Sequence, residues 1–122
     1  MNARHIPLDV TNQQTLDAAF KNIEGEFGSL DVLINNAGIS KYDGVSPSQL
    51  EMSELKETFE TNFFGMFAVT RTLLPFLRER PNGRIVNLSS DLGSITINSA
   101  PKSEWSRFNL LPITAPKQPL MP

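Results

Sequence analysis

Several residue types that carry much of protein chemistry are absent or scarce in this sequence. There is no cysteine, which excludes disulfides and thiolate metal ligands, and the single histidine, His5, cannot form a metal-binding cluster. The formal net charge of -2, with both signs interspersed, gives no basic surface for nucleic acid or a membrane. No stretch is long and apolar enough to cross a bilayer, and the N-terminal residues lack the apolar segment of a secretion signal. We therefore expect a cytoplasmic protein with no metal site and no nucleic-acid or membrane partner.

The residues that are present suit one domain followed by a tail. A chain of 122 residues can bury a single hydrophobic core. Five of the nine prolines lie in residues 99–122, where the helical periodicity also disappears. We expect residues 1–98 to form the domain and residues 99–122 to form an irregular, proline-rich tail.

The N-terminal part of the chain has the pattern of a strand followed by a helix. His5–Val10 is short and apolar, as in a strand, although Pro7 restricts it to an edge or an irregular start. Thr11 and Gln14 match a capping box with Thr11 at the N-cap, and the apolar residues that follow keep helical spacing. Gly28 then suits the end of this helix.

A longer helix and another strand follow. Apolar residues keep helical spacing from Met52 to Glu79, and Pro75 should bend or break the last turns. Arg84–Ser90 has the pattern of a buried strand that ends in polar groups. With a further strand at Leu30–Ile34, the order is β-α-β-α-β, which predicts an α/β fold with a partial doubly wound parallel sheet.

The stretch LDVLINNAG, Leu30 to Gly38, indicates where a ligand would bind. Its apolar run is typical of a strand buried on both faces, and in open α/β sheets ligands bind beyond the carboxyl ends of the strands. Asn35 and Asn36 offer carbonyl and amide groups, and Gly38 can adopt a positive φ, so a ligand can approach the backbone closely. The alternative is an ordinary strand followed by an Asx-Gly turn.

Four segments, in this order, resemble the short-chain dehydrogenase/reductase family. They are LDVT, LDVLINNAG, ETNFFG in the long helix and GRIVNLSS, and the resemblance covers residues 6–99. It implies a Rossmann-type sheet that binds NAD or NADP, and hydride transfer between the nicotinamide and a carbonyl or alcohol carbon of a small molecule. An unrelated doubly wound domain of the signalling type would have to contain these segments by accident.

The resemblance also implies cofactor-binding residues. Asp9 matches the acidic residue that accepts a hydrogen bond from the adenine amino group, and Val10 matches the residue that packs on the ring. Asp9 can instead, or at the same time, be a carboxylate that caps or faces the N-terminus of the next helix. The strand-end tetrapeptide, where the backbone approaches the adenosine half of the cofactor, is matched by Asn35, Asn36, Ala37 and Gly38.

Two residues match the family's catalytic positions. Asn62 lies among phenylalanines, where an amide is costly unless its hydrogen bonds are made. It matches the helix asparagine that holds a water in a proton relay and often accompanies a local helix irregularity; the alternative is a buried amide that bonds only a neighbouring carbonyl. Ser90 matches the serine that donates a hydrogen bond to the substrate oxygen. Without the resemblance, Ser89 and Ser90 would be read as strand-terminal caps.

Two motifs that the resemblance implies are not found. None of the seven glycines forms the GxxxGxG turn that cradles the pyrophosphate. The only tyrosine, Tyr42, lies in the wrong loop for the YxxxK motif, which supplies the general acid/base. We therefore expect a truncated fragment that is inactive alone and has lost most of its cofactor affinity. The alternative is a non-catalytic interaction module that pairs with a full-length homologue, or with its own copy, through the helix of residues 52–79.

Overall fold

The computed structural model describes residues 2–41 and 46–90, and the chain divides into two compact units. The first unit comprises Met1–Asn36 and Gly65–Asn87, and the second comprises Ala37–Phe64 and Leu88–Pro122. The expected proline-rich tail and the domain boundary at residue 98 lie outside the described residues.

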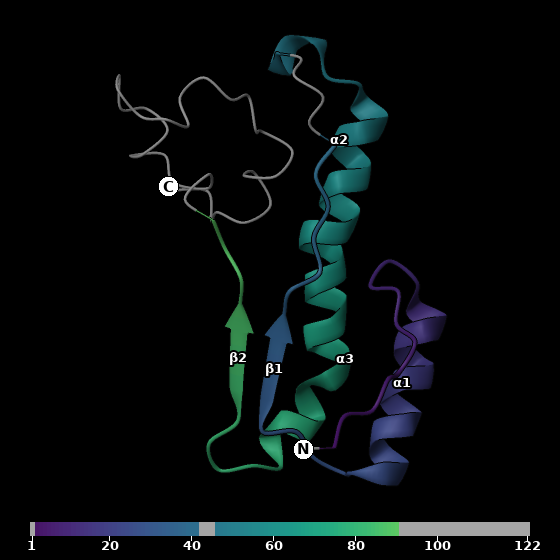
Figure 1. The fold of residues 1–122 in the computed structure, drawn as a ribbon, viewed down its shortest axis with the longest axis vertical. Coiled ribbons are helices and arrows are strands. Elements are labelled where there is room, and N and C mark those ends of the chain that lie inside the picture. The colour runs from purple at the N-terminus through teal and green to yellow at the C-terminus, as the bar shows by residue number, and fades with distance from the viewer. Residues whose placement is uncertain (1, 42–45, 91–122) are drawn as a thin grey trace. The chain divides into compact units, whose positions relative to one another are not determined.

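The first unit is a small parallel sheet with two helices. Its strands are β1, Val32–Asn35, and β2, Arg84–Asn87, which pair in parallel from Val32 opposite Arg84 to Asn35 opposite Asn87. Its helices are α1, Gln13–Glu26, and α3, Met66–Arg78. Figure 1 shows α3 beside β1 and α1 beside α3. The fold class predicted from the sequence, a partial α/β fold with a parallel sheet, is confirmed.

The core of this unit lies between α1, α3 and one face of β1. It consists of Leu16, Ile23, Leu33, Val69, Leu73, Phe76 and Leu77. The rings of Phe20 and Phe76 add a contact between the two helices, with 4.6 Å between their centroids. Burial of these side chains supplies most of the stabilisation of the unit, because each fully buried large apolar side chain contributes about 1.5–3 kcal/mol.

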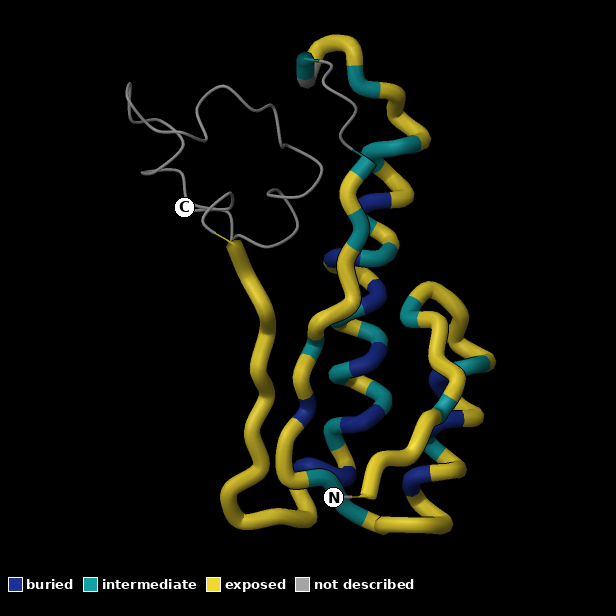
Figure 2. Tube along the Cα trace, in the orientation of Figure 1, coloured by how far each residue is buried: buried dark blue, intermediate teal, exposed yellow. Residues whose placement is uncertain are grey.

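The strands are more exposed than the sequence predicted. Side chains alternate between the faces of a strand, and only Leu33 of β1 is buried, whereas Val32 and Ile34 are exposed. Every residue of β2 is exposed (Figure 2). The expectation of strands buried on both faces was therefore wrong, because within the described residues the helices cover only one face of the sheet.

Helix α1 begins one residue later than the capping box indicated. Asn12, and not Thr11, is the N-cap, and its side chain accepts a hydrogen bond of 3.0 Å from the backbone N–H of Gln14. Asn and Thr are both good caps, so the sequence did not decide between neighbouring candidates. The helix ends as predicted: Gly28 has φ 74° and donates its N–H to the Ile23 carbonyl at 2.9 Å.

The predicted strand His5–Val10 does not form. This segment has no strand structure, and only Ile6 and Val10 pack against the core. Asp9, near its end, bonds the start of α1 instead. The Asp9 carbonyl accepts hydrogen bonds from the Asn12 N–H at 3.0 Å and from the Thr15 hydroxyl at 2.8 Å. Among the described residues the sheet consists of β1 and β2, and residues 5–10 take no part in its ladder.

The predicted long helix is present but changes its winding. It starts as α2, Met52–Phe59, continues as the π-helix η2, Glu60–Gly65, and ends as α3, which runs through Pro75 to Arg78. A short 3-10 helix, η1, Pro47–Gln49, precedes it. Pro75 does not end the helix at that point. Among the described residues, no helix is both long enough and apolar enough to span a membrane.

Candidate functional site

The carboxyl ends of β1 and β2 form the first part of the candidate site. Because the strands are parallel and in register, their last residues, Asn35 and Asn87, lie opposite each other at the same edge of the sheet. This is the edge at which open α/β sheets bind ligands. The structure therefore places Asn35 at the carboxyl edge of the sheet, and the ligand there stays a prediction.

The side-chain amide of Asn35 is bonded to two other elements. Its Nδ2 donates to Oδ1 of Asn87 at 2.8 Å and to Oγ1 of Thr70, on α3, at 3.0 Å. The sequence reasoning did not identify Asn87 or Thr70 as part of the site. A signal did exist for Thr70, because it is a polar residue beside the buried Val69 and three residues before the buried Leu73.

The residues that follow Asn35 leave the backbone accessible. Asn36, Ala37 and Gly38 are all exposed, and Ala37 and Gly38 add little bulk. Gly38 does not use the positive φ that glycine permits; among the described residues only Gly28 does. The lack of a side chain is thus the property of Gly38 that counts here.

Asn62 holds the loop that begins at Ala37. It lies in the π-helix η2, is only 2% exposed, and bonds the backbone of Ile39 at both polar groups. Its Oδ1 accepts from the Ile39 N–H at 2.8 Å, and its Nδ2 donates to the Ile39 carbonyl at 2.9 Å. The cost of burying this amide is thereby offset. Within the second unit, the side chain thus holds the backbone at Ile39, the residue after Gly38.

Asp9 and Val10 lie just before α1. The Asp9 carboxylate is exposed and accepts hydrogen bonds at Oδ1 from the Thr11 hydroxyl at 2.7 Å and the Thr11 N–H at 2.9 Å. These bonds, the side-chain one first, lower the pKa of Asp9 below its ordinary value of 3.8. Asp9 is therefore a carboxylate acceptor at neutral pH. Val10 is half-buried and packs against the core.

The predicted site residues are divided between the two units. The first contains Asp9, Val10, Asn35 and Asn36, and the second contains Ala37, Gly38, Asn62 and Ser90. Ser89 and Ser90 are exposed and follow β2. In the described part, hydrogen bonds join Asn35 to Asn87 and Asn62 to Ile39; the roles assigned to the eight predicted residues stay predictions.

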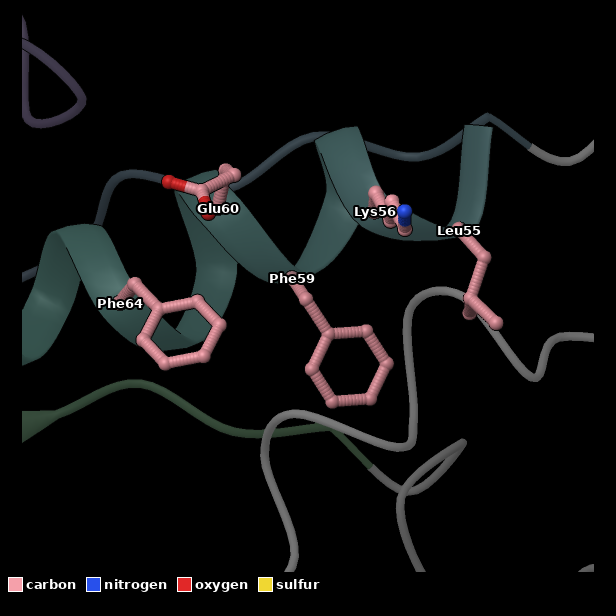
Figure 3. A pocket seen from close by; sticks show the side chains of 5 residues that line it. All are labelled: Leu55, Lys56, Phe59, Glu60 and Phe64. Atoms are coloured by element: carbon pink, nitrogen blue, oxygen red, sulfur yellow. The ribbon is translucent and has the colours of Figure 1, made fainter. Parts of the chain in front are cut away.

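A hollow with mostly apolar walls lies along α2 and η2. Its lining residues are Leu55, Lys56, Phe59, Glu60 and Phe64. Figure 3 shows the side chains of Leu55, Phe59 and Phe64 pointing to the same side of the helix. Three of the five lining side chains are apolar, so the hollow suits contact with an apolar surface.

Comparisons with known proteins agree with the fold of this chain. The family model described as short chain dehydrogenase matches residues 1–102. The short-chain dehydrogenase anuI of Penicillium roqueforti is 43% identical over 103 residues, which are 83% of this chain and 40% of that protein. The ligand-free aldohexose dehydrogenase of Thermoplasma acidophilum matches with a TM-score of 0.75 and 31% identity, over 93% of this chain and 40% of that one. NADPH-bound carbonyl reductase from chicken fatty liver matches with a TM-score of 0.79 and 25% identity, over 92% of this chain and 46% of that one. The chain thus spans about two fifths of the length of these relatives.

Proposed function

Because this chain belongs to the short chain dehydrogenase family, we propose that it carries the adenosine-binding half of an NAD(P)-dependent oxidoreductase site. Such an enzyme transfers hydride between the nicotinamide and a carbonyl or alcohol carbon of a small molecule. The observation that carries the proposal is the end of β1. The residues after Asn35 are exposed, and Ala37 and Gly38 add little bulk, while Asn35 itself is hydrogen-bonded to Thr70 and Asn87. The same proposal places the protein in the cytoplasm, without a nucleic-acid or membrane partner.

The described residues fit one half of such a cofactor. Asp9 is an exposed carboxylate, which can accept a hydrogen bond from an exocyclic amine, and Val10 supplies an aliphatic neighbour for a ring. Asn36, Ala37 and Gly38 present backbone with little side-chain bulk. Either NAD or NADP meets these requirements, and the carbonyl reductase of similar fold was determined with NADPH.

On the substrate side, the proposal assigns roles to Asn62 and Ser90. When bound, the dinucleotide supplies or accepts the hydride. Ser90 donates a hydrogen bond to the substrate oxygen, on which negative charge develops during reduction. Since both polar groups of the Asn62 side chain already bond Ile39, Asn62 acts on a relay water through its backbone and keeps the loop in place through its side chain.

We also propose that this polypeptide does not catalyse the reaction by itself. Its sequence contains no GxxxGxG turn, and the backbone N–H groups of such a turn bind the pyrophosphate. It contains no YxxxK motif either, so no phenol of lowered pKa is available to transfer a proton. On this proposal, these 122 residues supply part of a binding site, and the phosphate cradle and the proton donor are not among them.

Titration of the chain with NADH tests this proposal. The nicotinamide fluorescence should stay unchanged, and no oxidation of NADH should follow the addition of carbonyl compounds. An intact family member serves as the positive control under the same conditions. Saturable enhancement or shift of the fluorescence would overturn the proposed loss of affinity, and turnover would overturn the proposed inactivity.

A second function, a non-catalytic interaction module, is favoured by exposed aromatic residues. Phe63 and Phe64 are exposed although they are large and apolar, and their rings meet edge to face at 5.4 Å. Phe64 also lines the hollow along α2. Exposed apolar groups of this kind mark contact sites when they cluster. On this proposal the segment docks against the equivalent helix of a full-length homologue or of a second copy.

Light scattering after size-exclusion chromatography, alone and with a full-length homologue, tests the second function. Phe64→Asp should abolish the pairing, whereas Phe27→Asp, at an equally exposed phenylalanine after α1, should leave it unchanged. A monomer at every concentration that also fails to bind the homologue would reject the interaction module.

A further inference from the structure

Three elements of the first unit meet at a single nitrogen atom. The side-chain Nδ2 of Asn35, the last residue of β1, has two protons. One is donated to Asn87, the last residue of β2, at 2.8 Å, and the other to the Thr70 hydroxyl of α3 at 3.0 Å. The donor capacity of this amide is therefore used completely, and by partners that lie 52 and 35 residues away in the sequence.

We propose that Thr70 is a positioning residue that fixes the ligand-facing end of β1. The Thr70 hydroxyl and Asn87 together hold the Asn35 amide, so the amide cannot rotate without losing a bond to the helix or to the neighbouring strand. Neither Thr70 nor Asn87 touches a reacting group in this proposal. The role of Thr70 is to hold Asn35, after which the chain leads into the exposed Asn36.

The position of the contact explains why a side chain is needed for this. The ladder between β1 and β2 spans four residues in each strand and ends at the pair Asn35 and Asn87. A two-stranded sheet of this size is marginal in water, and its last pair is where it would fray. The hydrogen bond from Asn35 to Thr70 ties that last pair to α3, whose neighbouring residues Val69 and Leu73 are buried in the core.

The inference rests on the proposed function for its ligand, a nucleoside at the end of β1. The hydrogen bonds of the Asn35 side chain can be tested without that ligand. Nuclear magnetic resonance of the uniformly labelled full chain reports the Asn35 side-chain amide directly. In the unaltered protein, the Asn35 Nδ2 protons should show a nuclear Overhauser effect to Thr70 and slow exchange with water. Absence of that effect would overturn the proposal at once, whatever happens in any variant.

Thr70→Val removes the hydroxyl but preserves the shape of the side chain. Exchange of the Asn35 Nδ2 protons should become about two- to tenfold faster, the range for loss of one neutral hydrogen bond, and the backbone amide of Asn87 should shift. Thr70→Ser, which keeps the hydroxyl, should restore both signals. A role in packing alone predicts the opposite order, because serine loses the methyl group that valine keeps.

Thr72→Val is the matched control. Thr72 lies on the same helix and accepts a long hydrogen bond of 3.5 Å from Gln13. Its replacement should leave the Asn35 and Asn87 signals unchanged, and the proposal is wrong if Thr70→Val changes them no more than Thr72→Val does. If Thr70→Val does not fold, the proposal is tested by the Overhauser effect in the unaltered protein and by the Asn35 and Asn87 signals of Thr70→Ser. NADH that binds the unaltered chain would reject the proposed loss of cofactor affinity and leave this inference intact.

Discussion

Replacing Asn62 with leucine tests the contact between η2 and the loop after NNAG. Asn62→Leu keeps a side chain of similar size but removes the acceptor for the Ile39 N–H and the donor for the Ile39 carbonyl. The two backbone groups of Ile39 then have no partner from this helix. Since Asn62 is only 2% exposed, water does not easily take its place.

The size of the effect follows from these two bonds. Leaving a buried polar group without a partner costs about 1–3 kcal/mol. Ile39 is only half-buried, so the lower part of that range applies to each of its two groups. We expect the free energy of unfolding to fall by about 2–3 kcal/mol, a large share of the 5–15 kcal/mol that is typical of a folded domain.

Urea unfolding followed by far-ultraviolet circular dichroism measures the loss, and hydrogen exchange at the Ile39 amide locates it. Asn36→Leu is the control, because Asn36 is exposed just before this loop and its replacement should change stability by less than about 0.5 kcal/mol. Equal stability of the two variants, or unchanged exchange at Ile39, would refute the role given to Asn62. Asn62→Asp should be destabilised at neutral pH, when a carboxylate faces the Ile39 carbonyl, and should recover in acid, when a protonated carboxyl donates to it.

Three further predictions concern two glycines and the charge of Asp9. Gly83→Ala should destabilise the fold by about 1–3 kcal/mol in urea unfolding, because the added Cβ would overlap the Leu77 carbonyl oxygen; a neutral result would show that Gly83 does not lie this close to Leu77. Gly25→Ala should stabilise by about 0.5–1 kcal/mol, since Gly25 is helical and a Cβ there meets nothing within 4 Å; destabilisation would contradict that open surface. Thr11→Val should move the pKa of Asp9 back toward 3.8 in a titration followed by carboxyl chemical shifts. The variant loses the hydrogen bond from the Thr11 hydroxyl, which lowers this pKa more than the bond from the Thr11 N–H does. Because its pKa is lowered in the folded state, Asp9 stabilises the fold above its unfolded-state pKa, and this contribution is lost as the pH falls through the folded-state pKa. The difference in stability between Thr11→Val and the unaltered protein should therefore vanish in strong acid. A difference that persists there would have another cause.

The elements that the sequence predicted well are those whose signals are local. The helical spacing before Gly28 and from Met52 onward identified α1, α2 and α3, because the period of the apolar residues is a property of each segment alone. The apolar run before Asn35 likewise located β1 and its carboxyl end. Parallel order followed from the alternation of strands and helices, and the pairing of β1 with β2 confirms it.

The features that the sequence did not predict depend on distant partners. Burial of β1 and β2 requires a helix on each face, and the strand pattern cannot tell which faces are covered. Residues 5–10 have the composition of a strand, but they form none, and Asp9 bonds the start of α1 instead. Thr70 and Asn87 were missed because they reach Asn35 only through the fold, from 35 and 52 residues away.

The open edge of β1 has a consequence for handling this protein. In the part of the chain that the structure describes, β1 pairs with β2 on one side only, and Val32, Ile34 and Val86 are exposed beside it. An unpaired, apolar strand edge is a template for joining further chains edge to edge. Such growth would give large particles without any contribution from Phe63 or Phe64. Concentrated samples should therefore be checked for thioflavin binding before a high mass is attributed to specific pairing.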